Sequence, residues 1–333
     1  MSEVVIRGDG VGARCSIHLF QRAGIHVSAE QATRPKLPAI MLSESTQSLL
    51  KDVFGRPDLF AGLLPVRRRV VAWGNRAEPV VVPHSAVVAA EQDLLERLVP
   101  HLPPSLNEAD QPRWSIVGTR GPDEAGTEHH FGDRRASASR VQLKAEAYPD
   151  ACWIESLPQG WLFLLPIAEG LAWLLSVGGL PEELLADSRL VAQQISDSTK
   201  IGGEFASHPR VTDPFCGPGW IACGNAALGF DPLCGDGAGH AAREAILAAA
   251  VIKAALEGAD SAVVLAHYRS RLISGMQRHI EACLSFYEQG RSGPWWDRQL
   301  ELTRQGLAWC REQLRVSPAY RYRLNEFSLE PIA

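Results

Sequence analysis

The chain has 333 residues, of which 46% are hydrophobic and 21% charged, and its formal net charge at pH 7 is −5. This length allows one large domain or two coupled domains with a full core, and the composition is that of an ordinary globular protein. The mild negative charge gives no reason to expect nucleic acid or a membrane surface as a partner.

The sequence also indicates the cellular compartment of the protein. Charged residues interrupt the first apolar stretch, so no signal peptide is predicted, and no run reaches the roughly 18 apolar residues of a membrane span. Seven cysteines at irregular spacings predict reduced thiols in a cytoplasmic protein. Cys216, Cys223 and Cys234 lack the paired spacing of a zinc site, so we expect buried free thiols and no metal.

The N-terminal segment predicts a strand, a tight glycine turn and a helix. Residues 3–7 lead into Gly-Asp-Gly-Val-Gly-Ala, and the helix is expected to begin near Val11 and stop at Gly24, before a strand that ends at Glu30. Such a turn holds a dinucleotide pyrophosphate on backbone N–H groups. An acid about 20 residues further on suits a ribose diol, and we favour this interpretation of Glu30 over an ordinary exposed glutamate. The candidate dinucleotide-binding residues are Gly8, Gly10, Val11, Gly12, Ala13 and Glu30.

Strands and then helices follow along the chain. Alternating and β-branched residues bounded by turn residues predict the strands, and longer amphipathic or alanine-rich runs predict the helices. The expected elements are strands at 66–73, 79–83, 114–118, 151–155 and 161–166, and helices at 91–99, 237–256 and 261–314, the last divided into two or three.

A second glycine-rich segment spans residues 224–237, with the sequence Gly-Asn-Ala-Ala-Leu-Gly-Phe-Asp-Pro-Leu-Cys-Gly-Asp-Gly. It resembles the segment that closes over the isoalloxazine end of FAD in p-hydroxybenzoate-hydroxylase-type flavoproteins and flavin-dependent halogenases. Residues 42–46 resemble a strap that touches the flavin, with Ser43 in place of a glycine. Residues 160–166 resemble the strand ending in proline that leads to the active-site sheet. The chain therefore resembles the FAD-dependent monooxygenase and halogenase superfamily over most of residues 3–260.

The resemblance implies a two-lobed α/β (α+β) fold, in which a Rossmann-like FAD-binding domain is interleaved with a β-sheet substrate domain and followed by a helical C-terminal region. We expect residues 1–61, 112–136 and 205–260 to form the FAD-binding domain. Residues 62–111 and 137–204 would form the substrate domain, and 261–333 the helical region.

The resemblance also implies FAD as the cofactor. Asn225 stands where an aspartate normally binds the ribityl or pyrophosphate region, and Pro232 would lie beside the flavin ring. The segment 235–237 would direct N–H groups and a helix N-terminus toward the N1/O2 edge of the flavin. The further candidate FAD-binding residues are Ser45, Asn225, Pro232, Gly235, Asp236 and Gly237.

Departures from the family pattern restrict the expected reaction. Cys234 replaces the glutamate of tryptophan halogenases, and only Pro65 or the arginines at 67–69 lie where their lysine is expected, so tryptophan halogenation is disfavoured. The Asp-Gly motif of hydroxylases that use NAD(P)H directly is also absent, which is compatible with a separate flavin reductase.

The resemblance implies a monooxygenase that hydroxylates an aromatic group through a flavin C4a-hydroperoxide. The substrate is either an aromatic small molecule or a tryptophan side chain of a partner protein, as in the branch that matures tryptophylquinone cofactors. The alternatives are a flavin dehydrogenase or reductase without oxygen insertion, and a non-catalytic flavin-binding protein. His84, Glu155 and Trp161 are the candidate residues of the substrate pocket, and for each of them a structural role is the favoured alternative.

Overall fold

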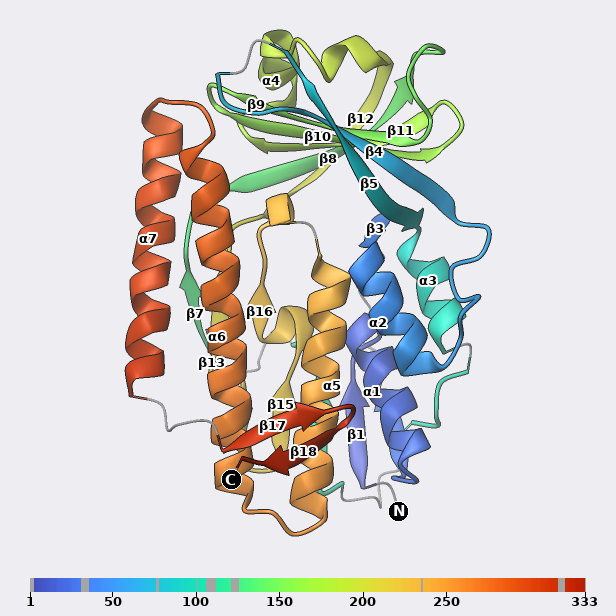
Figure 1. Cartoon of the computed structure of the whole chain (residues 1–333), viewed down its shortest axis with the longest axis vertical. Helices are drawn as coiled ribbons and strands as arrows, with labels where there is room; N and C mark the ends of the chain where they lie inside the picture. The colour runs from blue at the N-terminus through green and yellow to red at the C-terminus, as the bar shows by residue number, and fades with distance from the viewer. Residues whose placement is uncertain are drawn as a thin grey trace.

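The computed structural model describes residues 3–30, 36–75, 78–99, 101–105, 112–120, 126–234, 236–316 and 321–332. It has two lobes: a large β-sheet lies above a smaller sheet that is covered by helices, and a pair of long helices runs along one side (Figure 1). The expected two-lobed α/β fold is confirmed. No helix in the described ranges is long and apolar enough to span a membrane.

The smaller sheet has five strands and is built around β1. Strand β1 pairs in parallel with β2 on one side and β6 on the other, and the crossover from β1 to β2 is helix α1 (Val11–Arg22). The expected strand–helix–strand start of the chain is therefore confirmed. In spatial order the strands are β14 (Cys216–Gly217), β15 (Trp220–Ala222), β6 (Trp114–Val117), β1 (Val4–Arg7) and β2 (Val27–Glu30).

The larger sheet has eight strands and is antiparallel except where β4 pairs with β9. Successive side chains of a strand point to opposite faces, so each strand contributes to both sides of the sheet. One face packs on α4 (Pro181–Asp187), and the other meets residues of the lower lobe. In spatial order the strands are β12 (Ile195–Ala206), β8 (Arg135–Leu143), β11 (Leu171–Gly178), β10 (Gly160–Ala168), β9 (Ala151–Leu157), β4 (Leu64–Ala72), β5 (Val80–Ala89) and β3 (Ile40–Ser43).

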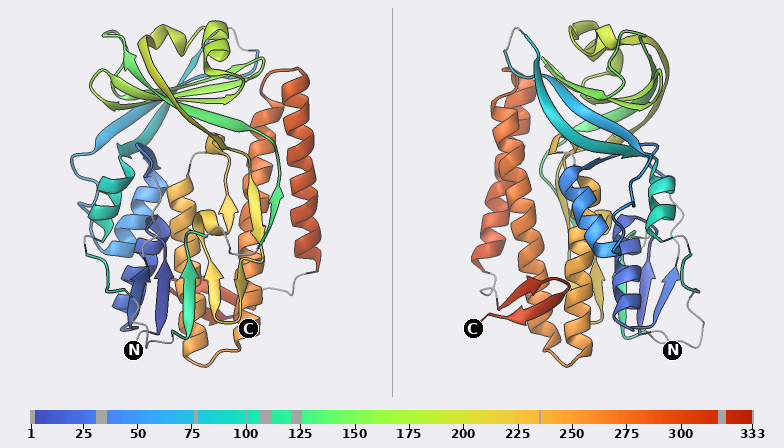
Figure 2. Two further views of the ribbon diagram at one scale, coloured as in Figure 1. Left: turned by 180° about the vertical axis from the view of Figure 1, so that it is seen from behind. Right: turned by 45° about the vertical axis from the view of Figure 1, so that its right-hand side comes forward.

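The helices of the lower lobe share one continuous apolar core with the five-stranded sheet. The alanine-rich helix α5 (Gly237–Leu256) packs closely against α1, and α2 (Glu44–Phe54) and α3 (Glu91–Leu98) lie beside α1. Figure 2 shows α6 (Ser261–Glu288) and α7 (Pro294–Arg315) side by side along the flank of the molecule.

The remaining elements are short. A three-stranded sheet and a C-terminal hairpin complete the fold, together with three single 3-10 turns. These elements are β7 (Thr127–His130), β13 (Arg210–Asp213), β16 (Leu228–Gly229), β17 (Tyr322–Asn325), β18 (Ser328–Pro331), η1 (Ala192–Gln194), η2 (Gly224–Ala226) and η3 (Pro232–Cys234).

The C-terminal region is helical over α6 and α7, and it ends in a hairpin of β17 and β18. Phe327 and Leu329 of this hairpin pack against the main core, and Glu326 adopts the positive φ of a tight turn. Two other elements cross the expected domain limits. Strand β3 pairs with β5 in the large sheet, and α3 packs in the core of the lower lobe. The division into domains at those limits stays a prediction.

Candidate functional site

The glycine turn after β1 has a backbone conformation and a close packing that favour glycine. Gly8 has a φ of +134°, and a Cβ placed on it would lie 3.2 Å from the Cα of Gly118. Gly10 occupies the N-cap of α1 and brings no side chain to the helix end. The first N–H groups of α1 therefore form the type of helix N-terminus that binds anions.

The N-terminal ends of α1 and α5 lie against each other. A Cβ on Gly12 would lie 3.3 Å from the carbonyl oxygen of Ala241 and 3.5 Å from Sγ of Cys223. The next residue, Ala13, is also buried in the main core. Small residues at the start of α1 therefore allow the two helix N-termini to approach, so that one extended ligand can contact both.

The expected ribose-binding acid, Glu30, ends β2 directly beside the end of β1. Its Oε2 accepts a hydrogen bond from Nε of Arg7 at 3.0 Å, and both side chains are about 40% exposed (44% and 39%). An exposed ion pair of this kind contributes at most about 1 kcal/mol. A ribose hydroxyl can therefore share or replace the arginine at low cost.

The strap at 42–46 and the second glycine-rich segment are joined through one hydrogen bond, although 190 residues separate them in sequence. Ser43 caps α2, since its Oγ accepts from the backbone N–H of Thr46 at 3.3 Å. The hydroxyl of Thr46 donates to the carboxylate of Asp236, which also accepts from Nη1 of Arg243 at 2.9 Å. Ser45 is exposed in the first turn of α2, with its Oγ 3.0 Å from that of Ser43.

Helix α5 begins at Gly237 without a side-chain cap, because the carboxylate of Asp236 is directed to Thr46 and Arg243 instead. This leaves a second helix N-terminus of the anion-binding type next to the first. Pro232 opens the turn η3 just before it. Gly235 lies outside the described residues.

Asn225 lies in η2 with an exposed side chain. Its backbone carbonyl oxygen accepts a hydrogen bond from Nη2 of Arg210 at 3.0 Å, which fixes the backbone of the turn. The preceding residue, Gly224, donates its N–H to Oε2 of Glu244 on α5 at 2.6 Å. Both contacts orient this turn, and the assignment of the Asn225 amide to FAD stays a prediction.

Asp231 anchors the segment that leads to α5. Its carboxylate accepts from Nε of Arg134 at 2.9 Å, from the hydroxyl of Tyr287 at 3.1 Å and from the backbone N–H of Leu233 at 2.9 Å. Arg134 and Asp231 have fully buried side chains. Sequence patterns did not indicate this network, because its members are far apart in the chain. Arg134 directly precedes β8, and Tyr287 lies near the end of α6.

The structure places Glu155 away from the lower lobe. It is 3% exposed and shares a face of β9 with Trp153, whose side chain packs in the cluster beneath α4. Its carboxylate accepts from the hydroxyl of Ser188 at 2.5 Å and from three consecutive backbone N–H groups, those of residues 189–191. Glu155 therefore holds a loop on the outer face of the sheet, and its expected place in a substrate pocket is not supported by these contacts.

Trp161 and His84 belong to strands whose inner face is directed at the lower lobe. Trp161 is 1% exposed, and its Nε1 donates to the hydroxyl of Tyr287 at 3.2 Å, so it packs within a core cluster that also contains Leu233. His84 is half-buried, with Nε2 3.4 Å from Nη2 of Arg69. Burial, and then the charge of Arg69, lower the pKa of His84. Of the three candidates, His84 has the environment most open to a ligand.

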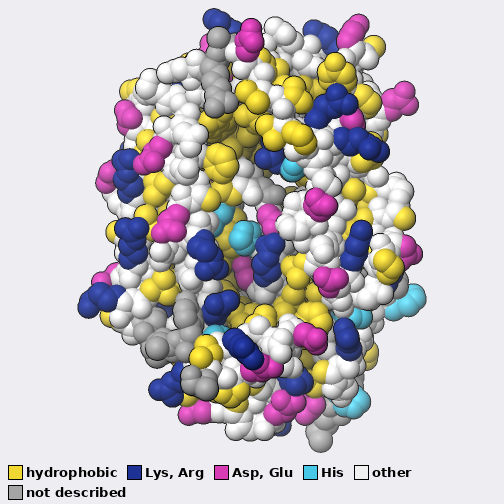
Figure 3. Space-filling view, viewed as in Figure 1, with side chains coloured by type: hydrophobic (Ala, Val, Ile, Leu, Met, Phe, Trp, Pro, Cys, Tyr) yellow, Lys and Arg dark blue, Asp and Glu magenta, His cyan; other side chains and the backbone are white. Residues whose placement is uncertain are grey.

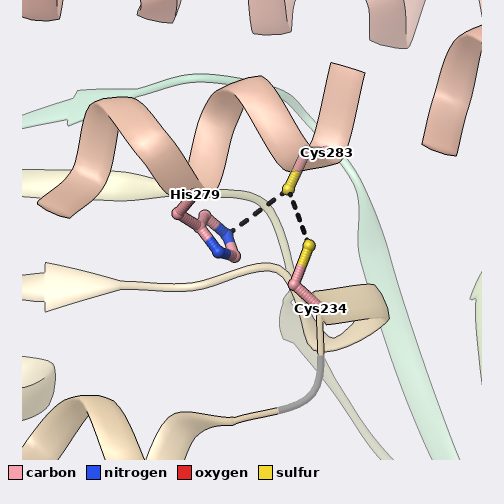
Figure 4. Close-up of side chains that lie close together, drawn as sticks. All are labelled: Cys234, His279 and Cys283. Atoms are coloured by element: carbon pink, nitrogen blue, oxygen red, sulfur yellow. Dashed lines mark hydrogen bonds between the residues drawn. The ribbon is translucent and has the colours of Figure 1, made fainter. Parts of the chain in front are cut away.

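A cluster of two cysteines and a histidine was not expected from the sequence. Figure 4 shows Cys234 of η3 facing His279 and Cys283 of α6. His279 and Cys283 are four residues apart and therefore share one face of a helix. That spacing is a signal in the sequence, but the position of Cys234 opposite this face depends on tertiary packing.

The molecular surface is hollowed between the eight-stranded sheet and the helices below it (Figure 3). Hydrophobic side chains cover part of the wall of this hollow, and histidine and basic side chains lie beside it. An apolar wall with a few polar groups suits an aromatic ligand.

The fold is found in several solved structures. The peptidyl tryptophan dihydroxylase QhpG, essential for tryptophylquinone cofactor biogenesis, matches with a TM-score of 0.74 and 18% identity over 99% of this chain and 86% of its own. The flavin-dependent halogenase CmlS matches with a TM-score of 0.77 and 16% identity over 94% of this chain and 71% of its own. The p-nitrophenol 4-monooxygenase PnpA from Pseudomonas putida has a TM-score of 0.67 and 16% identity over 95% of this chain and 97% of its own.

No protein-family model matches the sequence, and no curated protein sequence matches it. The similarity is therefore one of structure at low identity. It confirms the expected fold: the chain has the architecture of the flavin-dependent monooxygenases and halogenases.

Proposed function

We propose that the protein binds FAD and oxygenates an aromatic group. The observation that carries this proposal is the meeting of two helix N-termini, those of α1 and α5, which pack at Gly12 and Ala241. The strap at 42–46 is tied to the start of α5 by the bond between Thr46 and Asp236. This arrangement suits a ligand that is anionic at its centre and extended at both ends, as FAD is.

The residues of the chain fit FAD in order along its length. Glu30 would accept hydrogen bonds from the ribose, and the N–H groups of residues 10–13 would hold the diphosphate. The start of α5 at Gly237 would stabilise negative charge on the flavin ring, and Ser45 and Pro232 would border the ring. When bound, FAD supplies two-electron redox chemistry and the activation of oxygen. The chain contributes binding, orientation and exclusion of water.

We propose an aromatic substrate bound between the flavin and the inner face of the large sheet. Phe163 and Leu165 of β10 supply apolar surface on that face, and His84 and Arg69 supply polar groups beside it. Halogenation is not proposed, because β4 contains no lysine and Cys234 takes the place of the halogenase glutamate.

A tryptophan side chain of a partner protein is the more specific substrate that we propose. Two observations support it: the match to a peptidyl tryptophan dihydroxylase spans 99% of the chain, and the hollow between the lobes is open to the surface (Figure 3). An aromatic small molecule is the competing substrate. A separate flavin reductase would supply electrons in either case.

The first experiment is purification, followed by an absorption spectrum and extraction of the cofactor. We expect a flavin spectrum or binding of added FAD at micromolar concentrations. Gly8→Ala is the matched variant, because a Cβ at a φ of +134° strains the turn, and it should bind FAD at least about tenfold more weakly. A protein that fails to bind FAD would contradict the proposal.

The second experiment mixes the chemically reduced holoprotein with oxygen in a stopped-flow spectrometer. Oxygenation of a tryptophan-containing peptide or an aromatic compound, detected by a mass increase of one or two oxygen atoms, supports a monooxygenase. Rapid reoxidation without oxygen insertion into any aromatic compound would instead indicate a flavin dehydrogenase or reductase.

A further inference from the structure

The sulfur atoms of Cys234 and Cys283 are in contact across two elements that are distant in sequence. Their Sγ atoms lie 3.5 Å apart, joining η3 to α6. The two thiols differ in access: Cys234 is partly exposed, whereas Cys283 is fully buried. A disulfide bond is about 2.05 Å long, so the sulfur atoms have to approach by about 1.5 Å to form one.

The ring of His279 lies beside the buried thiol. Its Nε2 lies 3.4 Å from Sγ of Cys283 and accepts the backbone N–H of Asp231 at 2.9 Å. This second contact fixes the ring and assigns the imidazole proton to Nδ1. The lone pair of Nε2 is therefore engaged by that N–H, and the fixed ring borders the Cys283 thiol.

The two thiols also differ in acidity. The hydrogen bond from the Cys283 thiol lowers the pKa of Cys234 despite its burial. The same hydrogen bond and burial raise the pKa of Cys283. Cys234 is thus the thiol that can lose its proton first, and a thiolate is the nucleophile in thiol–disulfide exchange.

We propose that Cys234 and Cys283 are a redox-active dithiol that exchanges with small disulfide compounds. In the first step the thiolate of Cys234 attacks a sulfur of the compound RSSR, a mixed disulfide forms at Cys234, and RS⁻ leaves. In the second step Cys283 attacks Sγ of Cys234 and its proton passes to the departing sulfur, so the protein disulfide forms and the second thiol leaves as RSH. The two protein thiols are oxidised, and RSSR is reduced to two molecules of RSH.

A metal site is the competing interpretation of the same three side chains. The ligand atoms lie within 4.8 Å of one another, which is compatible with a soft divalent ion. However, a metal on Nε2 of His279 would displace the backbone N–H of Asp231 that this nitrogen accepts. Asp231 is 1% exposed, so the displaced N–H would be a buried donor without an acceptor. The dithiol requires no such loss.

The proposed disulfide would connect the segment that precedes α5 to α6. Cys234 lies three residues before the start of α5, so oxidation would restrain one border of the proposed flavin site. The exchange itself does not depend on FAD, and it can be tested on the protein with or without the cofactor.

The test is to incubate the full chain with oxidised glutathione, quench with acid, alkylate the free thiols under denaturing conditions and map the peptides by mass spectrometry. We expect two of the seven cysteines to become protected and a peptide pair joining Cys234 to Cys283 to appear. In Cys283→Ser a stable glutathione adduct should accumulate at Cys234. In Cys234→Ser the loss of thiols should be at least about tenfold slower.

Cys216→Ser is the matched control, because Cys216 is also a partly exposed cysteine of the lower lobe and should leave the exchange unchanged. Circular dichroism of each variant checks that it is folded. Persistence of seven reactive thiols, or a disulfide between other cysteines, would overturn the proposal. So would a stoichiometric metal ion that protects Cys234 and Cys283 until a chelator removes it. Absorption of bound FAD, recorded in parallel, separates this result from a failure of the proposed flavin function.

Discussion

Arg134 and Asp231 form an ion pair with no exposed side-chain surface, with Nη2 and Oδ2 2.8 Å apart. The guanidinium also lies over the ring of Tyr287, 4.6 Å from its centroid. This pair connects the start of β8 to the segment before η3 and thereby fixes the position of the second glycine-rich segment. It therefore holds the segment that precedes α5 in place.

Removing one member of the pair should be strongly destabilising. We expect Asp231→Ala to lower the free energy of unfolding by about 3–5 kcal/mol, because it leaves a buried guanidinium without its carboxylate. Urea denaturation measures this change. Glu288→Ala, which breaks an exposed pair with Arg304, is the control and should cost less than about 1 kcal/mol. Equal effects of the two variants would contradict the assigned role.

The contacts that a sequence can predict are local ones. The strand, glycine turn and helix at 3–24 and the long helix at 237–256 were predicted closely, because their turn residues and apolar spacing act within a few positions. The contact of Asp231 with Arg134 spans 97 residues, and that of Cys234 with Cys283 spans 49. No local pattern specifies such pairs, so these parts of the candidate site were found only in the structure.

Glu155 shows a second limit of sequence reasoning. Every residue of β9 is buried, so the strand lacks the alternation of polar and apolar residues that would tell which face a side chain occupies. A buried carboxylate in such a strand is compatible with either face. The hydrogen bonds to residues 188–191 determine the outcome.

The assigned role of Glu155 leads to a second expected outcome. Glu155→Ala should lower the free energy of unfolding by about 3 kcal/mol, because several buried donors lose a charged acceptor. The dissociation constant for FAD, measured by fluorescence titration, should change less than about twofold, since the residue lies on the outer face of the sheet. A variant of unchanged stability that no longer oxygenates its substrate would restore Glu155 to the pocket.

Glu30 should contribute to FAD affinity. We expect Glu30→Ala to raise the dissociation constant for FAD about tenfold, which corresponds to one charge-assisted hydrogen bond to the ribose. Isothermal titration with the apoprotein measures it. Arg7→Ala is the informative partner, because it frees Oε2 of Glu30 from its ion pair and should leave the affinity equal or slightly tighter. An unchanged affinity of Glu30→Ala for FAD would contradict the assignment of Glu30 to the ribose.

Glu244 should make stability depend on pH. Burial raises the pKa of this carboxyl to about 8, even though it accepts the N–H of Gly224, whereas the unfolded chain has an ordinary value near 4.3. Between these values the folded state retains a proton that the unfolded state loses, so this group's contribution to stability is full below about pH 4 and decreases up to about pH 8. We expect the stability of the wild type relative to Glu244→Gln to fall by about 1.4 kcal/mol per pH unit between pH 5 and 7, measured by urea denaturation. Gln keeps an acceptor for Gly224 but cannot ionise, so the comparison cancels the other titrating groups. A difference that is constant across this range would show that Glu244 is ionised in the folded protein.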